Sequence, residues 1–237
     1  MPGNRARNKL LREQQLLQLA QNILQQDGFA GLTMDRLTAA SEVSKGTIYN
    51  HFCSKEDLIT ALSVDSLQRQ LLLFHQVLAL PGHSRERALA LHYAYYRFST
   101  AEPTLFLCLL SATTAAVVEK TSATRLAQRQ ALEQQLLSCC EQVINQAIAD
   151  KALQLQAGRG IDQLTYLQWA LAFGANALYG PSQQMGFFQG LEQQQLMLAG
   201  INLLLDGLDW TPLSGQFDYQ QSWRRIAAAL PQTQAAQ

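Results

Sequence analysis

Three small polar residues early in the chain each stand directly before a short helical pattern. Thr33, Ser44 and Ser54 occupy these positions, and both residue types favour the N-cap because their hydroxyl accepts a hydrogen bond from a backbone N–H of the first turn. The close spacing of the first two caps allows only short helices, from Met34 to about Ala40 and from Lys45 to about Phe52. Two short helices joined by a turn of about three to four residues form a helix-turn-helix.

A longer amphipathic helix is expected before the first cap, from Arg12 to roughly Gln26. Its apolar residues recur at helical spacing: Leu16, Leu19, Ala20, Ile23 and Leu24. Gly28 then supplies a residue that readily adopts the left-handed conformation found just past helix ends. Leu37 and Val43 are expected to fix the crossing of the two short helices.

The second short helix has two chemically different sides. Ile48 and Phe52, at i and i+4, are expected to turn inward. The opposite side carries Lys45, Gly46, Tyr49 and Asn50, with Thr47 and His51 at its edges. A face that is small at its N-terminal tip and then rich in donors suits the phosphates and base edges of a DNA major groove. Glycine costs about 1 kcal/mol relative to alanine inside a helix, and close approach to DNA would account for that cost.

The segment from about Leu10 to Leu62 resembles the DNA-binding domain of the tetracycline-repressor (TetR) family. The resemblance rests on G-F-A-G-L-T at 28–33, V-S-K-G-T-I-Y-N-H-F at 43–52 and S-K-E-D-L at 54–58. The phrase L-L-D-G-L-D-W-T-P-L at 204–213 is also similar to the C-terminal ends of some members.

The resemblance implies which residues touch operator DNA: Thr33, Ser44, Lys45, Thr47, Tyr49, His51 and Lys55. Of these, Thr33, Tyr49 and Lys55 would bond phosphates. Lys45 could donate to guanine O6 and N7, Thr47 could contact a thymine methyl, and Asn50 could read adenine. Structural alternatives exist: Thr47 and Tyr49 could pack against the first helix, Lys45 and Lys55 could be solvated lysines, and His51 could be purely structural.

Two residues depart from the family pattern in the turn. Glu42 replaces the usual glycine, and Ser41 replaces a small apolar residue. Since the family glycine can take a positive φ, we expect mild backbone strain at Glu42, with its charge near phosphates.

The rest of the chain shows helical patterns and no sustained alternation of period two. Proline, glycine and small polar residues divide it into expected helices at Ser54 to about Leu80, Ser84 to Thr100, Pro103 to about Val118, Ser122 to Leu155, Asp162 to about Tyr179, about Gln189 to Leu205, and Tyr219 to Leu230. Gly180 and Pro181 are expected in a loop. The predicted fold is all-α, with a three-helix helix-turn-helix domain at 1–57 and a larger helical regulatory and dimerisation domain at 58–237.

The composition, with 48% apolar and 15% charged residues, is typical of a soluble globular protein. The net charge is zero, so no global field attracts nucleic acid. Four positive charges nevertheless cluster near the N-terminus, at Arg5, Arg7, Lys9 and Arg12. This basic arm is either a solvated tail or, next to the helix-turn-helix, a contact for phosphates or the minor groove.

Cysteine usage and hydropathy predict a cytoplasmic protein. The four cysteines form no C-x-x-C pair, and the N-terminus lacks the apolar region of a signal peptide. The stretch from Gln163 to Leu191 carries no charge, but polar residues and Pro181 interrupt it, so a buried helix plus a loop is expected and no membrane span. The vicinal pair Cys139 and Cys140 could sense oxidants or soft metals, or be buried structural thiols.

One helix-turn-helix domain contacts only a few base pairs, so regulators of this kind usually bind DNA as dimers on two half-sites. Two late helices offer apolar and small residues for such an interface: Leu167, Ala170, Leu171, Gly174, Ala177 and Leu178, then Leu191, Leu198, Ile201, Leu204 and Leu205. The resemblance implies a four-helix homodimer interface there. The alternative is that these residues form the core of one subunit.

In the TetR family the C-terminal domain usually binds a small molecule that changes DNA affinity. The middle helices carry candidates for such a pocket: His92, Tyr93, Tyr96, Phe98, Phe106, Cys108, Trp169, Phe173 and Asn176. Aromatics with few polar groups suit a small apolar or aromatic effector, although the same pattern is common in a protein core. No individual ligand residue is assigned.

Other classes of function have little support in the sequence. The chain has no G-x-S-x-G, phosphate loop, H-E-x-x-H or E-x-x-H pair, so we expect no catalytic residues, no metal site and no cofactor. A helix-turn-helix adaptor that docks protein is the alternative to DNA binding. The residues do not distinguish a repressor from an activator, and repression is the family's common mode.

Overall fold

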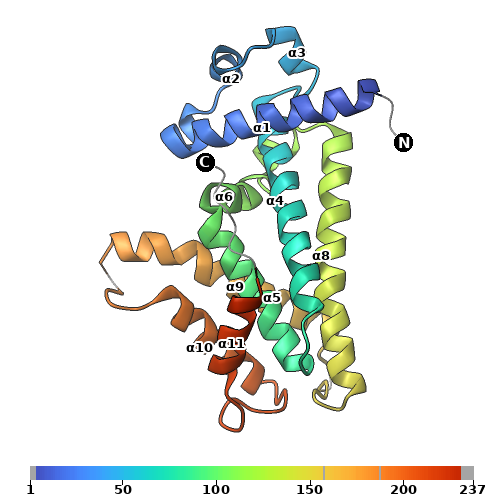
Figure 1. Ribbon diagram of the computed structural model, residues 1–237, viewed down its shortest axis with the longest axis vertical. Helices are drawn as coiled ribbons and strands as arrows, with labels where there is room; N and C mark the ends of the chain where they lie inside the picture. Colours follow the sequence, from blue (N-terminus) through green and yellow to red (C-terminus); the bar gives the residue numbers. More distant parts are fainter. Residues whose placement is uncertain (1–3, 157, 187, 231–237) are drawn as a thin grey trace. The chain divides into compact units, whose positions relative to one another are not determined.

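The computed structural model describes residues 4–156, 158–186 and 188–230, and every regular element in these ranges is a helix (Figure 1). The helices are α1 (Asn4–Gly31), α2 (Met34–Ala40), α3 (Lys45–Tyr49), α4 (Lys55–Leu78), α5 (Ser84–Ala101), α6 (Pro103–Ser111), α7 (Ala115–Val118), α8 (Ala123–Ala149), α9 (Ile161–Gln184), α10 (Gln193–Asp206) and α11 (Tyr219–Ala229). The predicted all-α class, with an N-terminal helix-turn-helix and a larger helical part, is confirmed.

The chain forms two compact units. Unit 1 comprises Met1–Gln68 and Glu102–Leu132, and unit 2 comprises Arg69–Ala101 and Glu133–Gln237. Unit 1 therefore holds the helix-turn-helix together with the start of α4, with α6, α7 and the start of α8. The domain division at residues 57 and 58 stays a prediction.

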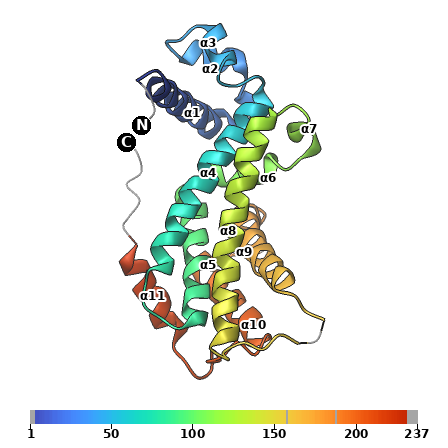
Figure 2. The ribbon, with the colours of Figure 1, turned by 90° about the vertical axis from the view of Figure 1, so that its right-hand side faces the viewer.

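In unit 1, the two short helices α2 and α3 lie together at one end, beside the long α1 (Figures 1 and 2). Leu37 from α2, Ile48 from α3 and Phe52 just after it are all fully buried. Burying each such side chain contributes about 1.5–3 kcal/mol. The predicted inward orientation of Ile48 and Phe52 is confirmed.

Two predictions near the N-terminus were wrong. Helix α1 begins at Asn4, well before the predicted Arg12, so the basic arm is helical. Glu42 has no positive φ, since Lys151 and Asp209 are the non-glycine residues with that conformation in the described ranges; the turn is built without a left-handed residue. Gly28 does take a positive φ (66°), which interrupts the helical backbone of α1.

Three later helix boundaries also differ from the predictions. The expected helix from Pro103 is two helices, α6 and α7, separated after Ser111. Helix α8 ends at Ala149, before the positive φ of Lys151. Helix α9 continues through Pro181 to Gln184, although proline removes one backbone donor.

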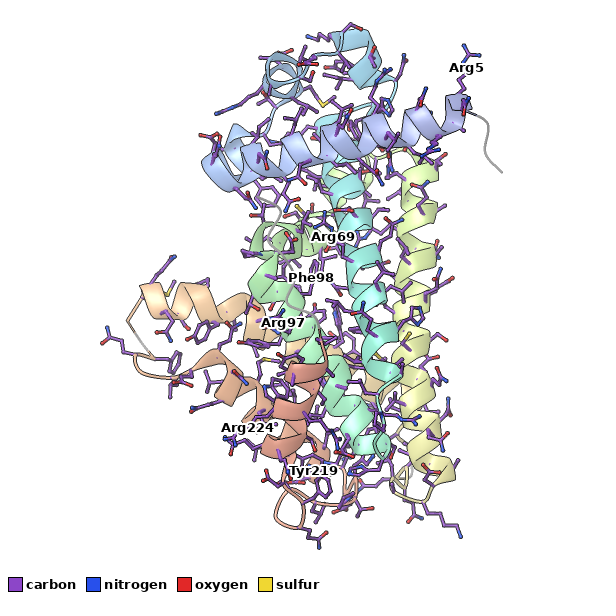
Figure 3. All side chains as sticks on the ribbon, viewed as in Figure 1. Arg5, Arg69, Arg97, Phe98, Tyr219 and Arg224 are labelled. Atoms are coloured by element: carbon purple, nitrogen blue, oxygen red, sulfur yellow. The ribbon has the colours of Figure 1, made fainter. Side chains whose placement is uncertain are left out.

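Helix α5 is the centre of unit 2, where it packs against α9, α10 and α11. Its Arg85 is fully buried. The guanidinium donates to the Trp210 carbonyl, forms an ion pair of 2.6 Å with Asp206, and lies 4.6 Å from the centre of the Tyr219 ring. Tyr219 is labelled at the start of α11 in Figure 3. One side chain of α5 thus fixes the end of α10, the loop after it and α11.

Helix α9, in the uncharged stretch, is buried on one side only. Leu164, Gln168 and Ala172 are buried, whereas Tyr166 and Leu178 are exposed. The expectation of a buried helix therefore holds for one side of α9 only. Across the residues that the structure describes, no helix combines the length and apolar content that a bilayer crossing requires.

Replacing Asp206 by asparagine tests the Arg85 cluster. Burial alone would raise the pKa of Asp206, but hydrogen bonds from Ser214 and the Arg85 guanidinium hold it below its ordinary value of 3.8. A lowered folded-state pKa stabilises the protein above the unfolded-state value, and this contribution is lost as pH falls through the folded-state pKa. At pH 7, Asp206→Asn should lower the free energy of unfolding by about 3 kcal/mol because it leaves a buried cation without its counter-charge.

Denaturant titrations at pH 7 and across pH 5 to about 2 would measure both effects. Asp209→Asn is the matched control, since Asp209 is an exposed residue of the loop that follows α10 and asparagine tolerates its positive φ. Equal unfolding free energies for wild type and Asp206→Asn would show that Asp206 does not stabilise the cluster.

Candidate nucleic-acid interface

The helix-turn-helix is capped as the sequence predicts. The Thr33 hydroxyl accepts from the Arg36 backbone N–H at 3.1 Å, and the Ser44 hydroxyl accepts from the Thr47 N–H at 3.3 Å. The Ser44 and Thr47 hydroxyls are also 3.0 Å apart. Helix α3 ends at Tyr49 with Asn50 as its C-cap, about one turn before the predicted end at Phe52. The caps are needed because a helix this short cannot stabilise itself.

One side of α3 is open to solvent. Lys45, Gly46, Tyr49 and Asn50 are exposed, while Ile48 on the opposite side is fully buried. Tyr49 is a large aromatic residue with 42% of its surface exposed. Packing within the protein therefore does not explain why an aromatic residue occupies this position. The structure thus brings together the predicted contact face, with Thr47 half-buried at its edge.

Gly46 lies where an outside partner could approach the backbone. A Cβ built at this position would meet only the Ser44 hydroxyl, at 4.0 Å. Packing inside the protein therefore does not require glycine here, although glycine lowers helix propensity. A surface that must approach another molecule closely would require it.

Lys45 is held by an exposed ion pair with Asp35 of α2, with 2.7 Å between Nζ and Oδ1. The hydrogen bond and the charge of Asp35 raise the pKa of Lys45. Its ammonium also lies 6.0 Å from the centre of the Tyr49 ring. Because exposed pairs are weak, a phosphate or a base edge can replace Asp35 as the partner of this ammonium.

The remaining predicted contact residues have different surroundings. Thr33 is exposed and its hydroxyl is used as the cap of α2. Lys55 donates from Nζ to the Phe29 carbonyl at 2.7 Å, which ties the start of α4 to the end of α1. The His51 side chain is only 5% exposed, and its Nδ1 lies 3.3 Å from Oε2 of Glu13.

Glu13, Asp35 and Arg125 take part in this site although sequence reasoning missed them. Asp35 lies in the first turn of α2, where an acidic residue favours the helix dipole, and this placement was the available signal. Glu13 and Arg125 form an ion pair of 2.8 Å between residues far apart in the chain, and no local pattern predicts such a pair.

The basic residues at the N-terminus lie on a helix and are all exposed. Arg5, Lys9 and Arg12 are spaced by four and then three positions, so they share one face of α1. Figure 3 shows Arg5 extending from the N-terminal end of α1, away from the other helices of unit 1. These residues form a basic stripe on a helix.

The residues considered for an effector pocket come from both units. Phe106 and Cys108 belong to unit 1, and the other candidates belong to unit 2. In unit 2, His92 is buried with Nε2 3.4 Å from the Gln168 side-chain oxygen, and burial lowers the pKa of His92 to about 4. Asn176 accepts from the Ser99 hydroxyl at 2.8 Å and from the Gln193 amide at 3.0 Å.

The other aromatics of that set have a mixed placement. Tyr93 packs edge-on against Trp223, with 4.8 Å between ring centres, Tyr96 lies beside the same ring at 6.1 Å, and Phe98 is buried. Trp169 is 49% exposed and lies 5.8 Å from Phe173. Of these rings, Tyr93 and Phe98 therefore belong to the core of unit 2.

The two vicinal cysteines are not exposed thiols. Cys139 is buried and Cys140 is partly buried. Burial is the main cause that raises the pKa of both, to about 12 for Cys140, and it disfavours the reactive thiolate. Within the described ranges, no three histidine, cysteine, aspartate or glutamate residues lie together so that they could hold a metal ion.

The predicted dimer residues divide into buried and exposed groups. Ile201 and Leu205 are fully buried within one subunit, and Leu171 of α9 lies 3.7 Å from where a Cβ of Gly200 in α10 would stand. The placement of Ile201 and Leu205 at a dimer surface was wrong. Leu167, Leu178 and Leu191 are exposed.

Comparison with known proteins agrees with this geometry. Residues 16–62 match the family model described as bacterial regulatory proteins, tetR family. The HTH-type transcriptional regulator UidR of Escherichia coli strain K12 is 34% identical over 61 residues, which cover 26% of this chain and 31% of UidR. The match thus spans about a third of the relative's length.

Solved structures share the fold over most of the chain. The TetR family regulator PfmR of Thermus thermophilus has a TM-score of 0.62 at 16% identity, covering 81% of this chain and 98% of that one. FadR of Bacillus subtilis, in complex with stearoyl-CoA, has a TM-score of 0.64 at 12% identity, covering 82% and 98%. The capped helix-turn-helix lies inside the segment that the family model matches, so residues 16–62 are similar to the corresponding segment of bacterial regulatory proteins of the tetR family.

Proposed function

We propose that the protein is a transcriptional regulator that binds operator DNA through α3 and acts as a repressor that a small-molecule effector releases. The observation that carries this proposal is the open side of α3. This short helix is capped by Ser44 and held by the buried Ile48. It presents lysine, glycine, tyrosine and asparagine to solvent, and a recognition helix in a major groove requires such a surface.

Each residue of the open side has a role that its surroundings allow. Lys45 reads guanine O6 and N7, Thr47 contacts a thymine methyl, and Asn50 reads adenine. Gly46 and Ser44 form the small tip that lets the backbone approach the duplex.

Other residues bind the phosphate backbone and fix the register. Tyr49 and Thr33 donate from exposed hydroxyls. Lys55 uses one donor on Phe29 and keeps others for a phosphate, since an ammonium has three. The stripe of Arg5, Lys9 and Arg12 adds salt-dependent affinity. His51 is too buried for a direct contact, and we assign it a positioning role.

The active form is proposed to be a homodimer. Exposed apolar residues of α9, α10 and the segment between them would form the interface: Leu167, Leu178, Leu191, Leu196 and Leu203. Apolar residues exposed in such number along neighbouring helices mark an interaction surface. Two recognition helices about 34 Å apart would then meet successive major grooves on one side of the duplex.

The effector is proposed to be a small apolar or aromatic molecule bound in unit 2. Buried aromatic residues of α5, among them Tyr93 and Phe98, support such a ligand in this unit. Binding can weaken DNA affinity only if the effector prefers the conformation that binds DNA poorly.

A selection of bound sequences from random duplexes, repeated with candidate effectors, tests the proposal. Recovery of a two-fold symmetric site supports a dimeric DNA reader, and loss of binding with an effector supports regulated repression. An adaptor that docks protein would recover no sequence, and its weak association with duplexes would have no preferred site.

Replacing Lys45 by alanine should relax the sequence preference. We expect a loss of about 1–3 kcal/mol of discrimination at one base pair per half-site, with binding to a scrambled duplex changed much less. Competition titrations with single-base variants of the selected site would measure this. A uniform loss over all variants would assign Lys45 to the phosphates.

Tyr49→Phe removes the hydroxyl and keeps the ring. Because a phosphate contact carries no sequence information, we expect affinity to fall by about fivefold on selected and scrambled duplexes alike, as for one lost hydrogen bond. Fluorescence anisotropy on both duplexes would measure the ratio. Unchanged affinity on both would remove Tyr49 from the interface.

A further inference from the structure

Glu13, in the N-terminal half of α1, joins three separate parts of unit 1. Its Oε1 lies 2.8 Å from a guanidinium nitrogen of Arg125, in the first turn of α8, and its Oε2 lies 3.3 Å from Nδ1 of His51, just after α3. The three side chains are little exposed: 18% for Glu13, 12% for Arg125 and 5% for His51. One shielded carboxylate therefore connects α1, α8 and the residue that follows α3.

The contact continues to the next residue of the turn. The Arg125 guanidinium lies 5.8 Å from the centre of the Phe52 ring, and Phe52 is fully buried. His51 and Phe52 are thus held by charged partners as well as by the apolar core. Since α3 has few internal hydrogen bonds, its direction depends on how these two residues are held.

Arg125 is itself firmly placed. The Ser122 backbone N–H and hydroxyl donate to Oδ1 of Asp57 at 3.0 and 2.7 Å, and the Ser54 hydroxyl donates to the Lys120 carbonyl at 2.9 Å. These bonds fix the start of α8 to the first turn of α4. The ion pair between Glu13 of α1 and Arg125 of α8 therefore joins two helices that are each held in place within unit 1.

We propose that Glu13 is a positioning residue for DNA recognition, whose carboxylate sets the angle of α3 by holding His51 and Arg125 together. This inference rests on the proposed DNA-binding function. Glu13 itself touches no DNA, and its effect reaches the duplex through the direction of the Lys45–Tyr49 surface.

Electrostatics alone would give the opposite effect. A negative charge near a DNA-binding surface repels phosphates, so neutralising it should strengthen binding to every duplex. A positioning carboxylate should instead weaken binding to the preferred site when it is neutralised, because α3 is then held less firmly in the required direction. The sign of the change separates the two accounts.

The test compares Glu13→Gln with Glu42→Gln. Glu42 is an exposed glutamate in the turn between α2 and α3, so its replacement removes the same charge near the same surface. The probes are the duplex that the wild-type protein selects from a random pool and a scrambled duplex of equal composition. We expect Glu13→Gln to bind the selected duplex about tenfold more weakly, as for one charged hydrogen bond, and to lose selectivity. Glu42→Gln should bind both duplexes as tightly as wild type or more tightly.

The Arg125→Lys variant tests the same positioning role through the other member of the ion pair. Lysine keeps the charge but loses the planar guanidinium, so selectivity should fall in the same direction as for Glu13→Gln. In the double variant the two losses should not add, because both changes act on the same ion pair. Circular dichroism and thermal unfolding would confirm that each variant is folded. If Glu13→Gln does not fold, the selectivity of Arg125→Lys decides whether the positioning role holds.

Two failures can be told apart. If wild type selects no duplex, the proposed function is wrong and the positioning role falls with it. If wild type selects a duplex and folded Glu13→Gln binds it with unchanged or greater selectivity, the function stands and the positioning role is wrong.

Discussion

The whole site depends on how a five-residue helix is held in place. A helix of this length is unstable in water on its own, because nucleation costs more than so few hydrogen bonds return. Helix α3 exists here because Ser44 caps its start and because Ile48 and Phe52 are fully buried beneath it. Since the apolar side is fixed inward, the polar side is fixed outward. Exposure of Lys45, Gly46, Tyr49 and Asn50 is therefore a consequence of packing.

Two ion pairs add to the apolar packing that holds the helix-turn-helix. Asp35 holds the Lys45 ammonium at the solvent side of the helix-turn-helix, where the pair is easily exchanged. Glu13 forms a shielded pair with Arg125 behind α3, where the pair can resist such exchange. The two carboxylates thus act differently because their exposure differs: one occupies a cation that DNA can take over, and the other fixes the support of the helix.

Local chemistry was predictable from the sequence, and long-range pairing was not. Thr33 and Ser44 are confirmed as caps because capping is decided within one turn, and Ile48 and Phe52 are confirmed as buried because their spacing defines one face. The partnership of Glu13 with Arg125 depends on the tertiary fold and leaves no local pattern. The expectation of backbone strain at Glu42 was wrong. It rested on the glycine that is usual at this position in the family, whereas this turn contains no positive φ at Glu42.

Unit 2 was harder to read, and for a similar reason. An apolar residue at helical spacing is equally suited to a subunit core and to an interface between subunits, and only the tertiary structure of unit 2 shows that Ile201 and Leu205 are buried. Pro181 was taken as the end of a helix that in fact continues through it. In both cases a local rule did not decide the tertiary structure.

Site-specific photocrosslinking from α3 tests the central claim most directly. A photoreactive amino acid at position 47, at the edge of the predicted contact face, should crosslink to bases in both halves of the selected duplex, whereas the same group at Gln216, an exposed position of unit 2, should give no crosslink. A protein–DNA complex that forms without any base crosslink from position 47 would contradict the account, because α3 would then lie outside the groove.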